Sequence, residues 1–144
     1  MATTTWDVRM MSVKTLADKL SSEEIIIPEH QRNYVWSEKA AGLFIDSLLK
    51  GLPCPSLLIY EERRQPLSLE DGSQRLRTIV NYMNDEFGSS PDPGVRPEVK
   101  FSELSQADKA RLEERRLAKE VVPFEEFVNQ LKRELDQLLN DALK

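Results

Sequence analysis

Short apolar runs that alternate with segments of helical period limit the folds open to this chain more than any other feature. Residues 24–27 and 57–60, Glu-Ile-Ile-Ile and Leu-Leu-Ile-Tyr, have the length and the apolar, β-branched character of buried strands. Between them, Ser37 is placed to cap a helix whose apolar residues run to Leu49, and Gly51 is placed to end it. Strands and helices that alternate within 144 residues predict a single α+β domain.

The other expected elements follow from the same two periods. Apolar residues at helical spacing predict helices over 12–21, 76–87 and 105–117, and alternation predicts a strand over 66–70. A short strand at 99–101 and a surface loop at 88–94 complete the pattern. We assign the lysines and glutamates from Lys109 to Glu120 to the solvated face of a helix.

The last part of the chain has a heptad pattern, which divides it into a domain at 1–122 and a helix at 123–144. Apolar residues recur there in steps of four and three, at Phe124, Val128, Leu131, Leu135, Leu138 and Ala142. Fewer than three heptads make a weak coiled coil, so this seam needs a partner surface. We favour packing on its own domain; a homodimer contact and a contact with another protein or a downstream domain are the alternatives.

Charge and rare residues exclude several classes of function. The net charge of −5 and the pI of about 5.0 argue against wrapping nucleic acid, although a local patch of Arg63, Arg64, Arg75 and Arg77 stays open as a weaker alternative. One histidine, His30, and one cysteine, Cys54, cannot build a zinc site by themselves, and we expect no metal-ligating residues. The N-terminus lacks the features of a secretory signal, and no apolar run is long enough to span a membrane, so we expect a cytoplasmic protein without membrane contact.

The segment Asp-Gly-Ser-Gln-Arg at 71–75 is the strongest candidate for chemistry. It joins a strand to a helix, where unpaired N–H groups and the helix dipole favour an anion. Gly72 permits a tight turn, while Arg75 lies in the first helical turn, where a cation is disfavoured unless a phosphate neutralises it. A plain turn with a surface arginine is the commoner meaning of so short a pattern.

A second cluster occupies residues 28–36, between a strand and a capped helix. Arg32 could supply another phosphate contact, and Gln31 or Asn33 could bond the polar edges of a base or sugar. Trp36 precedes the N-cap, so we expect it to act as a hydrophobic staple rather than to stack on a base.

Three segments in this order resemble a known family. They are 27–37 (Ile-Pro-Glu-His-Gln-Arg-Asn-Tyr-Val-Trp-Ser), 51–55 (Gly-Leu-Pro-Cys-Pro) and 71–79 (Asp-Gly-Ser-Gln-Arg-Leu-Arg-Thr-Ile). The chain is similar over about residues 11–122 to the N-terminal domain of GmrSD-type restriction systems, a domain-of-unknown-function family with a DGQQR signature. The resemblance implies a ParB/sulfiredoxin-like fold, a small mixed sheet flanked by helices.

The resemblance also implies a function. It implies binding of a nucleoside triphosphate and, in some members, its hydrolysis, often in anti-phage defence against modified DNA. That Mg²⁺ accompanies the nucleotide is our own hypothesis. From the motifs and the resemblance together we expect the following nucleotide-binding residues: Gln31, Arg32, Asn33, Asp71, Gly72, Ser73, Gln74 and Arg75. Asp71 and Ser73 are the catalytic candidates, but Ser73 stands where the family usually has glutamine, which puts hydrolysis in more doubt than binding.

Two functions follow as alternatives. The first is a nucleotide-binding domain, with or without weak NTPase activity, that regulates a DNA-targeting enzyme and meets DNA only indirectly. The second is a non-catalytic interaction module that acts through the C-terminal helix. Family members usually continue into a helical half and a nuclease domain, and this chain has no nuclease motif, so we expect no DNA cleavage by the chain alone.

Overall fold

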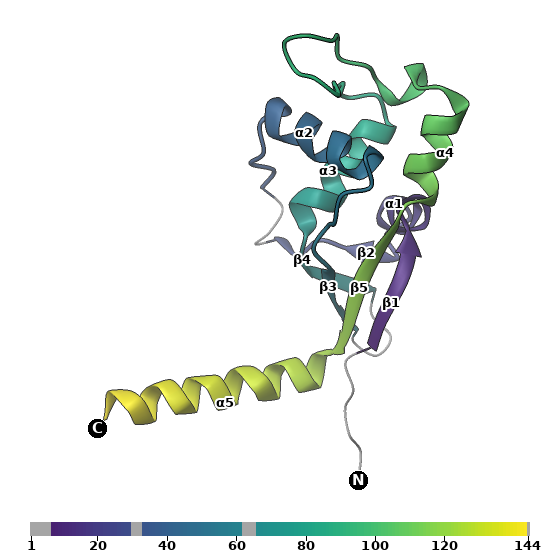
Figure 1. Ribbon diagram of the computed structural model, residues 1–144. Coiled ribbons are helices and arrows are strands. Elements are labelled where there is room, and N and C mark those ends of the chain that lie inside the picture. The colour runs from purple at the N-terminus through teal and green to yellow at the C-terminus, as the bar shows by residue number, and fades with distance from the viewer. Residues whose placement is uncertain (1–6, 30–32, 62–65, 144) are drawn as a thin grey trace.

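The core of the protein is a five-stranded mixed sheet (Figure 1). The computed structural model describes residues 7–29, 33–61 and 66–143. The strands lie in the order β1-β5-β3-β4-β2. Their bounds are Asp7–Ser12 for β1, Ile25–Ile26 for β2, Leu57–Glu61 for β3, Leu67–Asp71 for β4 and Arg116–Pro123 for β5.

Strand β5 lies inside the sheet, between β1 and β3, although it is the last strand in sequence. It pairs antiparallel with β1 along most of its length and parallel with β3. On the other side of β3, β4 pairs antiparallel and is followed by the two-residue edge strand β2, which is parallel to it. Parallel and antiparallel pairs in one sheet, with helices packed against it, confirm the predicted α+β class.

Five α-helices accompany the sheet in the described part of the chain. They are α1 (Val13–Ser21), α2 (Glu38–Leu49), α3 (Ser73–Met83), α4 (Gln106–Glu114) and α5 (Phe124–Ala142), with a short 3₁₀ helix, η2, at Phe101–Glu103. Serines cap three of them: the hydroxyl groups of Ser12, Ser37 and Ser105 each accept a bond from a backbone N–H three residues on.

The apolar faces of α1, α2, α3 and α4 meet those of the inner strands in one core. Fully buried members include Leu16, Ile45, Leu57, Ile79 and Leu112, one from each of five elements. Tyr82 is also fully buried in this core, with its ring against those of Phe87 and Phe101. These helices therefore fix the position of the start of α3 relative to the sheet.

The main error of the sequence prediction concerns residues 115–123. We expected a helix to about Leu117 and a solvated helical face to Glu120, but α4 ends at Glu114 and β5 follows at once. Leu, Ala, Lys and Glu all favour helices, yet alternation puts Leu117, Lys119 and Val121 on one buried face, with Lys119 only 5% exposed. Pairing on both sides by β1 and β3 overrides local propensity here. The partner strand β1 was also missed.

Smaller differences lie at element ends. Helix α3 ends at Met83 rather than Phe87. The strand expected at 99–101 is one isolated bridge between Ser89 and Val99, and η2 starts at Phe101. After α3 the chain turns at Asp85, which has φ of 61° and so cannot continue the helix.

Helix α5 extends away from the body of the molecule (Figure 1). It begins at the residue that follows the last residue of β5, with no loop between them. The expectation that its seam packs on its own domain is wrong for the outer half of the helix, because Leu135 and Leu138 are 58% and 67% exposed. Along the described ranges no helix has both the length and the apolar composition needed to cross a membrane.

Candidate functional site

The candidate site is built around the turn from β4 into α3. Gly72 is the N-cap residue, with φ of 96° and ψ of 14°. A Cβ at this position would collide with Cδ2 of Leu57, so both the left-handed backbone and the space require glycine. The first helical hydrogen bond runs from Leu76 N–H to the Gly72 carbonyl (3.0 Å), which leaves the N–H groups of residues 73–75 without a partner inside the helix. Because Gly72 has no side chain, it cannot cap these donors itself.

Arg75 points into the protein, where its side chain is only 12% exposed. Its Nη1 donates to the Pro55 carbonyl and lies 3.9 Å from the Cys54 sulfur, and its Nη2 is 3.4 Å from the Ser56 carbonyl. Nη2 is also 3.8 Å from an Asp71 carboxylate oxygen. Carbonyl oxygens and a carboxylate thus compensate the cation that the sequence left unexplained at the positive end of a helix. The guanidinium fastens residues 54–56 to the start of α3.

The two catalytic candidates differ in access. The side chain of Asp71 is 72% exposed, so its carboxylate is open to solvent at the mouth of the turn. Ser73 is 7% exposed and buried beneath the same turn. The structure therefore leaves Asp71, and not Ser73, accessible to a ligand from outside. The catalytic role of either residue stays a prediction.

Gln74 joins the turn to the segment 33–35 through both ends of its amide. Its Nε2 donates to the Asn33 carbonyl (2.7 Å), and its Oε1 accepts from the Val35 N–H (2.9 Å). These groups are 41 and 39 residues from Gln74 in sequence. Gln74 therefore acts as a clamp that holds the second predicted cluster against α3.

Tyr34 strengthens this contact one turn further along α3. Its hydroxyl lies 2.5 Å from the Thr78 hydroxyl, which donates to the Gln74 carbonyl (2.6 Å). The Arg77 guanidinium lies over the Tyr34 ring, 5.5 Å from its centroid. Sequence reasoning missed Thr78; its position four residues after Gln74, on the same helical face, is the signal that could have found it.

The rest of the second cluster is described only in part. Trp36 packs edge-to-face on Phe44 of α2, with ring centroids 5.4 Å apart. Phe44 is the seventh residue of the helix, whereas a hydrophobic staple uses the fourth, Ala41, so the staple itself stays a prediction. His30, Gln31 and Arg32 lie outside the described residues. The structure thus brings Asn33 and Gln74 together, while the predicted phosphate contact from Arg32 stays a prediction.

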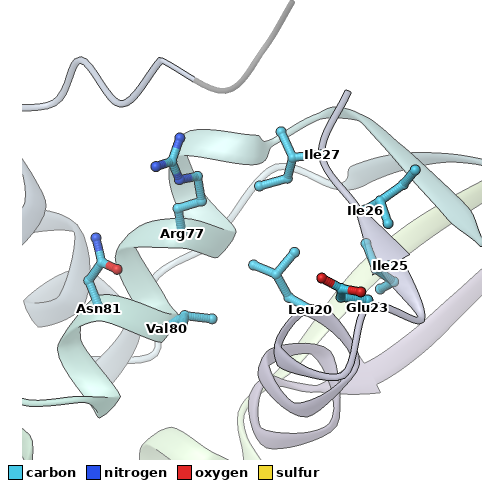
Figure 2. Close-up of a pocket in the computed structure, with 8 residues that line it drawn as sticks. All are labelled: Leu20, Glu23, Ile25, Ile26, Ile27, Arg77, Val80 and Asn81. Carbon is cyan, nitrogen blue, oxygen red and sulfur yellow. The ribbon is translucent and has the colours of Figure 1, made fainter. Parts of the chain in front are cut away.

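A cavity of about 330 Å³ opens on the side of α3 that carries Arg77 (Figure 2). Arg77, Val80 and Asn81 form one wall, and residues from the end of α1 through β2 form the other, with Glu23 among them. Sequence reasoning assigned no role to Glu23 or Asn81. The signal that could have pointed to this wall is the spacing of Ser73, Arg77 and Asn81, which recur every four residues along α3.

Two weaker expectations are also affected. Within the described ranges, no group of three or more histidine, cysteine, aspartate or glutamate residues is placed to hold a metal ion. The arginine patch considered for DNA loses Arg75, because that side chain is turned inward. Arg63 and Arg64 lie outside the described residues.

The comparison with protein families matches residues 13–144 to the N-terminal domain of the GmrSD restriction endonuclease. No curated protein and no solved structure shows a match. The ParB/sulfiredoxin-like topology therefore stays a prediction, while the resemblance carried by the three motifs is confirmed over nearly the whole chain. This chain belongs to the family of GmrSD restriction endonuclease N-terminal domains.

Proposed function

We propose that this domain binds a nucleoside triphosphate, with Mg²⁺, and so regulates a restriction system that acts against foreign DNA. The family supports the restriction role. The observation that carries nucleotide binding is the start of α3, where three backbone N–H groups lack helical partners and the N-cap residue is a glycine without a side chain to cap them. Such an N-terminus favours phosphate through both hydrogen bonds and the helix dipole.

The clamp formed by Gln74 supports the same proposal. It fixes residues 33–35 beside the first turn of α3, so the loop that precedes them starts from an anchored point. Arg32 is the residue of that loop to which we assign the second phosphate contact, because a guanidinium binds phosphate in a bidentate way. Asp71, exposed at the same turn, is the carboxylate to which we assign Mg²⁺.

Arg75 has a different part in this proposal from the one its sequence position suggested. Its contacts to the carbonyl groups of Pro55 and Ser56 shape the floor of the turn. Replacing Arg75 would disrupt that floor as well as weaken a ligand, so it gives no clean test of binding. Arg32→Ala removes a predicted phosphate contact and leaves the Arg75 side chain itself unchanged.

Isothermal titration with ATP, GTP, CTP and UTP in the presence of Mg²⁺ tests the proposal. We expect heat from at least one nucleotide and a loss of about tenfold or more in affinity for Arg32→Ala, since a hydrogen bond to a charged group contributes about 1.5–3 kcal/mol. Arg111→Ala, which removes an exposed arginine on α4, is the matched control and should bind normally. A folded wild-type sample that gives no heat with any of the four would end the proposal.

Hydrolysis is a separate question, which phosphate release answers. If Asp71 holds Mg²⁺ for turnover, Asp71→Asn should abolish any release that the wild type shows. The carboxylate is exposed, so this substitution should leave the fold intact. Release that is unchanged in Asp71→Asn would exclude a catalytic role for this residue.

The exposed seam of α5 favours a second function, a contact with another protein. Helix α5 extends away from the body of the molecule (Figure 1), and Leu135 and Leu138 are exposed on it. A homodimer and a different partner are both compatible with this surface. Sedimentation of the wild type and of Leu135→Glu over a range of concentrations separates them: a wild-type dimer that the substitution dissociates supports self-association, and a wild-type monomer excludes it.

A further inference from the structure

The cavity beside α3 has the composition of a small-ligand site. Most of its lining residues are apolar, while two polar residues, Arg77 and Asn81, come from α3 and a third, Glu23, comes from the opposite wall (Figure 2). The apolar lining consists of Leu20, Ile25, Ile26, Ile27 and Val80. Its volume of about 330 Å³ lies at the lower end of the range for sites that hold small molecules.

The cavity lies beside the same helix whose start forms the candidate phosphate site. Ser73, Arg77 and Asn81 follow one another at intervals of four, so they share one face of α3. With a rise of about 1.5 Å per residue, Arg77 lies about 6 Å and Asn81 about 12 Å beyond Ser73 along the helix. A nucleotide whose phosphates bind the start of α3 would have to extend about this far along the helix to place its base in the cavity.

Arg77 is held at the edge of this cavity. Its guanidinium lies over the Tyr34 ring, and Tyr34 is itself fixed to α3 through the Thr78 hydroxyl. A flexible cation is thereby placed in a defined position, as a binding site requires.

The backbone of Glu23 gives an independent reason to look at this cavity. Glu23 follows the C-cap residue of α1 and has φ of 64°, a left-handed conformation that glycine usually occupies at a helix end. Its side chain nevertheless lies at the cavity and not away from it (Figure 2). A residue held in an unfavourable conformation beside a cavity is typical of functional sites.

We propose that this cavity binds the base of the nucleotide and selects guanine. Guanine has hydrogen-bond donors, N1–H and the 2-amino group, on one edge and acceptors, O6 and N7, on another. A carboxylate such as Glu23 accepts from the first edge, and a guanidinium such as Arg77 donates to the second. Adenine places an acceptor where the carboxylate needs a donor and an amino group where the guanidinium needs an acceptor. The apolar side chains contact the faces of the ring.

This inference rests on the proposed nucleotide binding, and titration with GTP, ITP and ATP separates the two. GTP should bind tightest; ITP, which lacks only the 2-amino group, and ATP should bind about ten- to a hundredfold more weakly. Equal affinity for the three nucleotides overturns guanine selection and leaves nucleotide binding intact. Absence of binding to all three overturns both.

Glu23→Gln locates the selectivity. This variant should lower the affinity for GTP to that for ATP and leave the affinity for ATP unchanged. The reason is that it removes the pair of acceptor oxygens that only the donor edge of guanine uses. Glu24→Gln is the control: Glu24 is the next residue, is exposed and pairs with Lys19 and Ser22. Selectivity for GTP that persists in Glu23→Gln places base recognition elsewhere and overturns the cavity assignment.

Glu23→Gly removes the same carboxylate and serves as the test if the Glu23→Gln variant folds poorly. Glycine adopts the left-handed conformation readily, so this variant should melt no lower than the wild type while it loses the preference for GTP. A glycine variant that is folded and still prefers GTP would likewise overturn the assignment.

Discussion

Replacing Gly72 by alanine tests the turn on which the candidate site depends. The position combines two constraints that other glycines of the chain show one at a time. Its φ of 96° disfavours any residue with a Cβ, and that Cβ would collide with Leu57 Cδ2 and come within 3.1 Å of Arg75 Nη2. We therefore expect a loss larger than backbone strain alone can produce.

The magnitude follows from adding the two terms. A left-handed conformation costs a residue with a Cβ about 1–2 kcal/mol, and an atom forced into a filled site costs about 1–3 kcal/mol. Their sum, about 2–5 kcal/mol, is a large fraction of the roughly 5–15 kcal/mol that stabilises a typical domain. For a chain of this size it corresponds to a fall in melting temperature of roughly 6–15 °C.

Two other glycines supply matched controls. Gly94 has φ of 84° and no atom within 4 Å of the position that a Cβ would take, so Gly94→Ala measures strain alone. Gly88 has no positive φ, but its Cβ would lie 2.9 Å from Glu98 Cβ, so Gly88→Ala measures crowding alone. Thermal and urea denaturation of the three variants should show the largest loss for Gly72→Ala, close to the sum of the other two.

The thiol of Cys54 reports the local consequence of the Gly72 substitution. It is the only cysteine in the chain, and its sulfur lies 3.9 Å from Arg75 Nη1. Gly72→Ala should displace the guanidinium and make Cys54 react faster with a thiol reagent, while Gly94→Ala should not. A Gly72→Ala variant as stable as Gly94→Ala, with unchanged thiol reactivity, would refute the reasoning that the turn is sterically fixed.

Two further predictions concern the clamp and the core. Gln74→Ala removes the hydrogen bonds to Asn33 and Val35, so it should lower the free energy of unfolding by about 1–3 kcal/mol and speed hydrogen exchange in residues 33–36. Gln74→Glu keeps only the bond from Val35, so its stability should lie between those of the wild type and Gln74→Ala. Burial, followed by nearby carboxylates, raises the pKa of Tyr82 from 10.0 to about 12, so the folded state holds this proton more tightly than the unfolded state. Stability that depends on the neutral Tyr82 hydroxyl should be complete below about pH 10 and should fall by about 2–3 kcal/mol as the pH rises to about 12, a loss that urea denaturation of Tyr82→Phe should not show.

Features that depend on only a few neighbouring residues could be predicted from the sequence. Ser12, Ser37 and Ser105 each precede a helix and cap it through a bond to an N–H three residues away, so the sequence alone contains both partners. The strand at Leu57–Glu61 and the turn at Gly72 could also be predicted, because an apolar run and a glycine each indicate the conformation of the backbone at their own position. The three motifs were likewise enough to indicate the family that the comparison confirms.

Contacts between distant residues decided the rest. Residues 116–123 have helix-favouring side chains and become a strand because β1 and β3 offer hydrogen-bond partners on both sides. The sequence shows a cation at Arg75 but not the carbonyl groups about 20 residues earlier that compensate it. Gln74 and Glu23 acquire their positions in the same way, from segments that only the folded chain brings together. Local chemistry therefore determined most of the elements and the turn, while tertiary packing decided which side chains support that turn and which stay exposed at it. The physical reason is that burial and pairing energies depend on neighbours that a linear pattern does not contain.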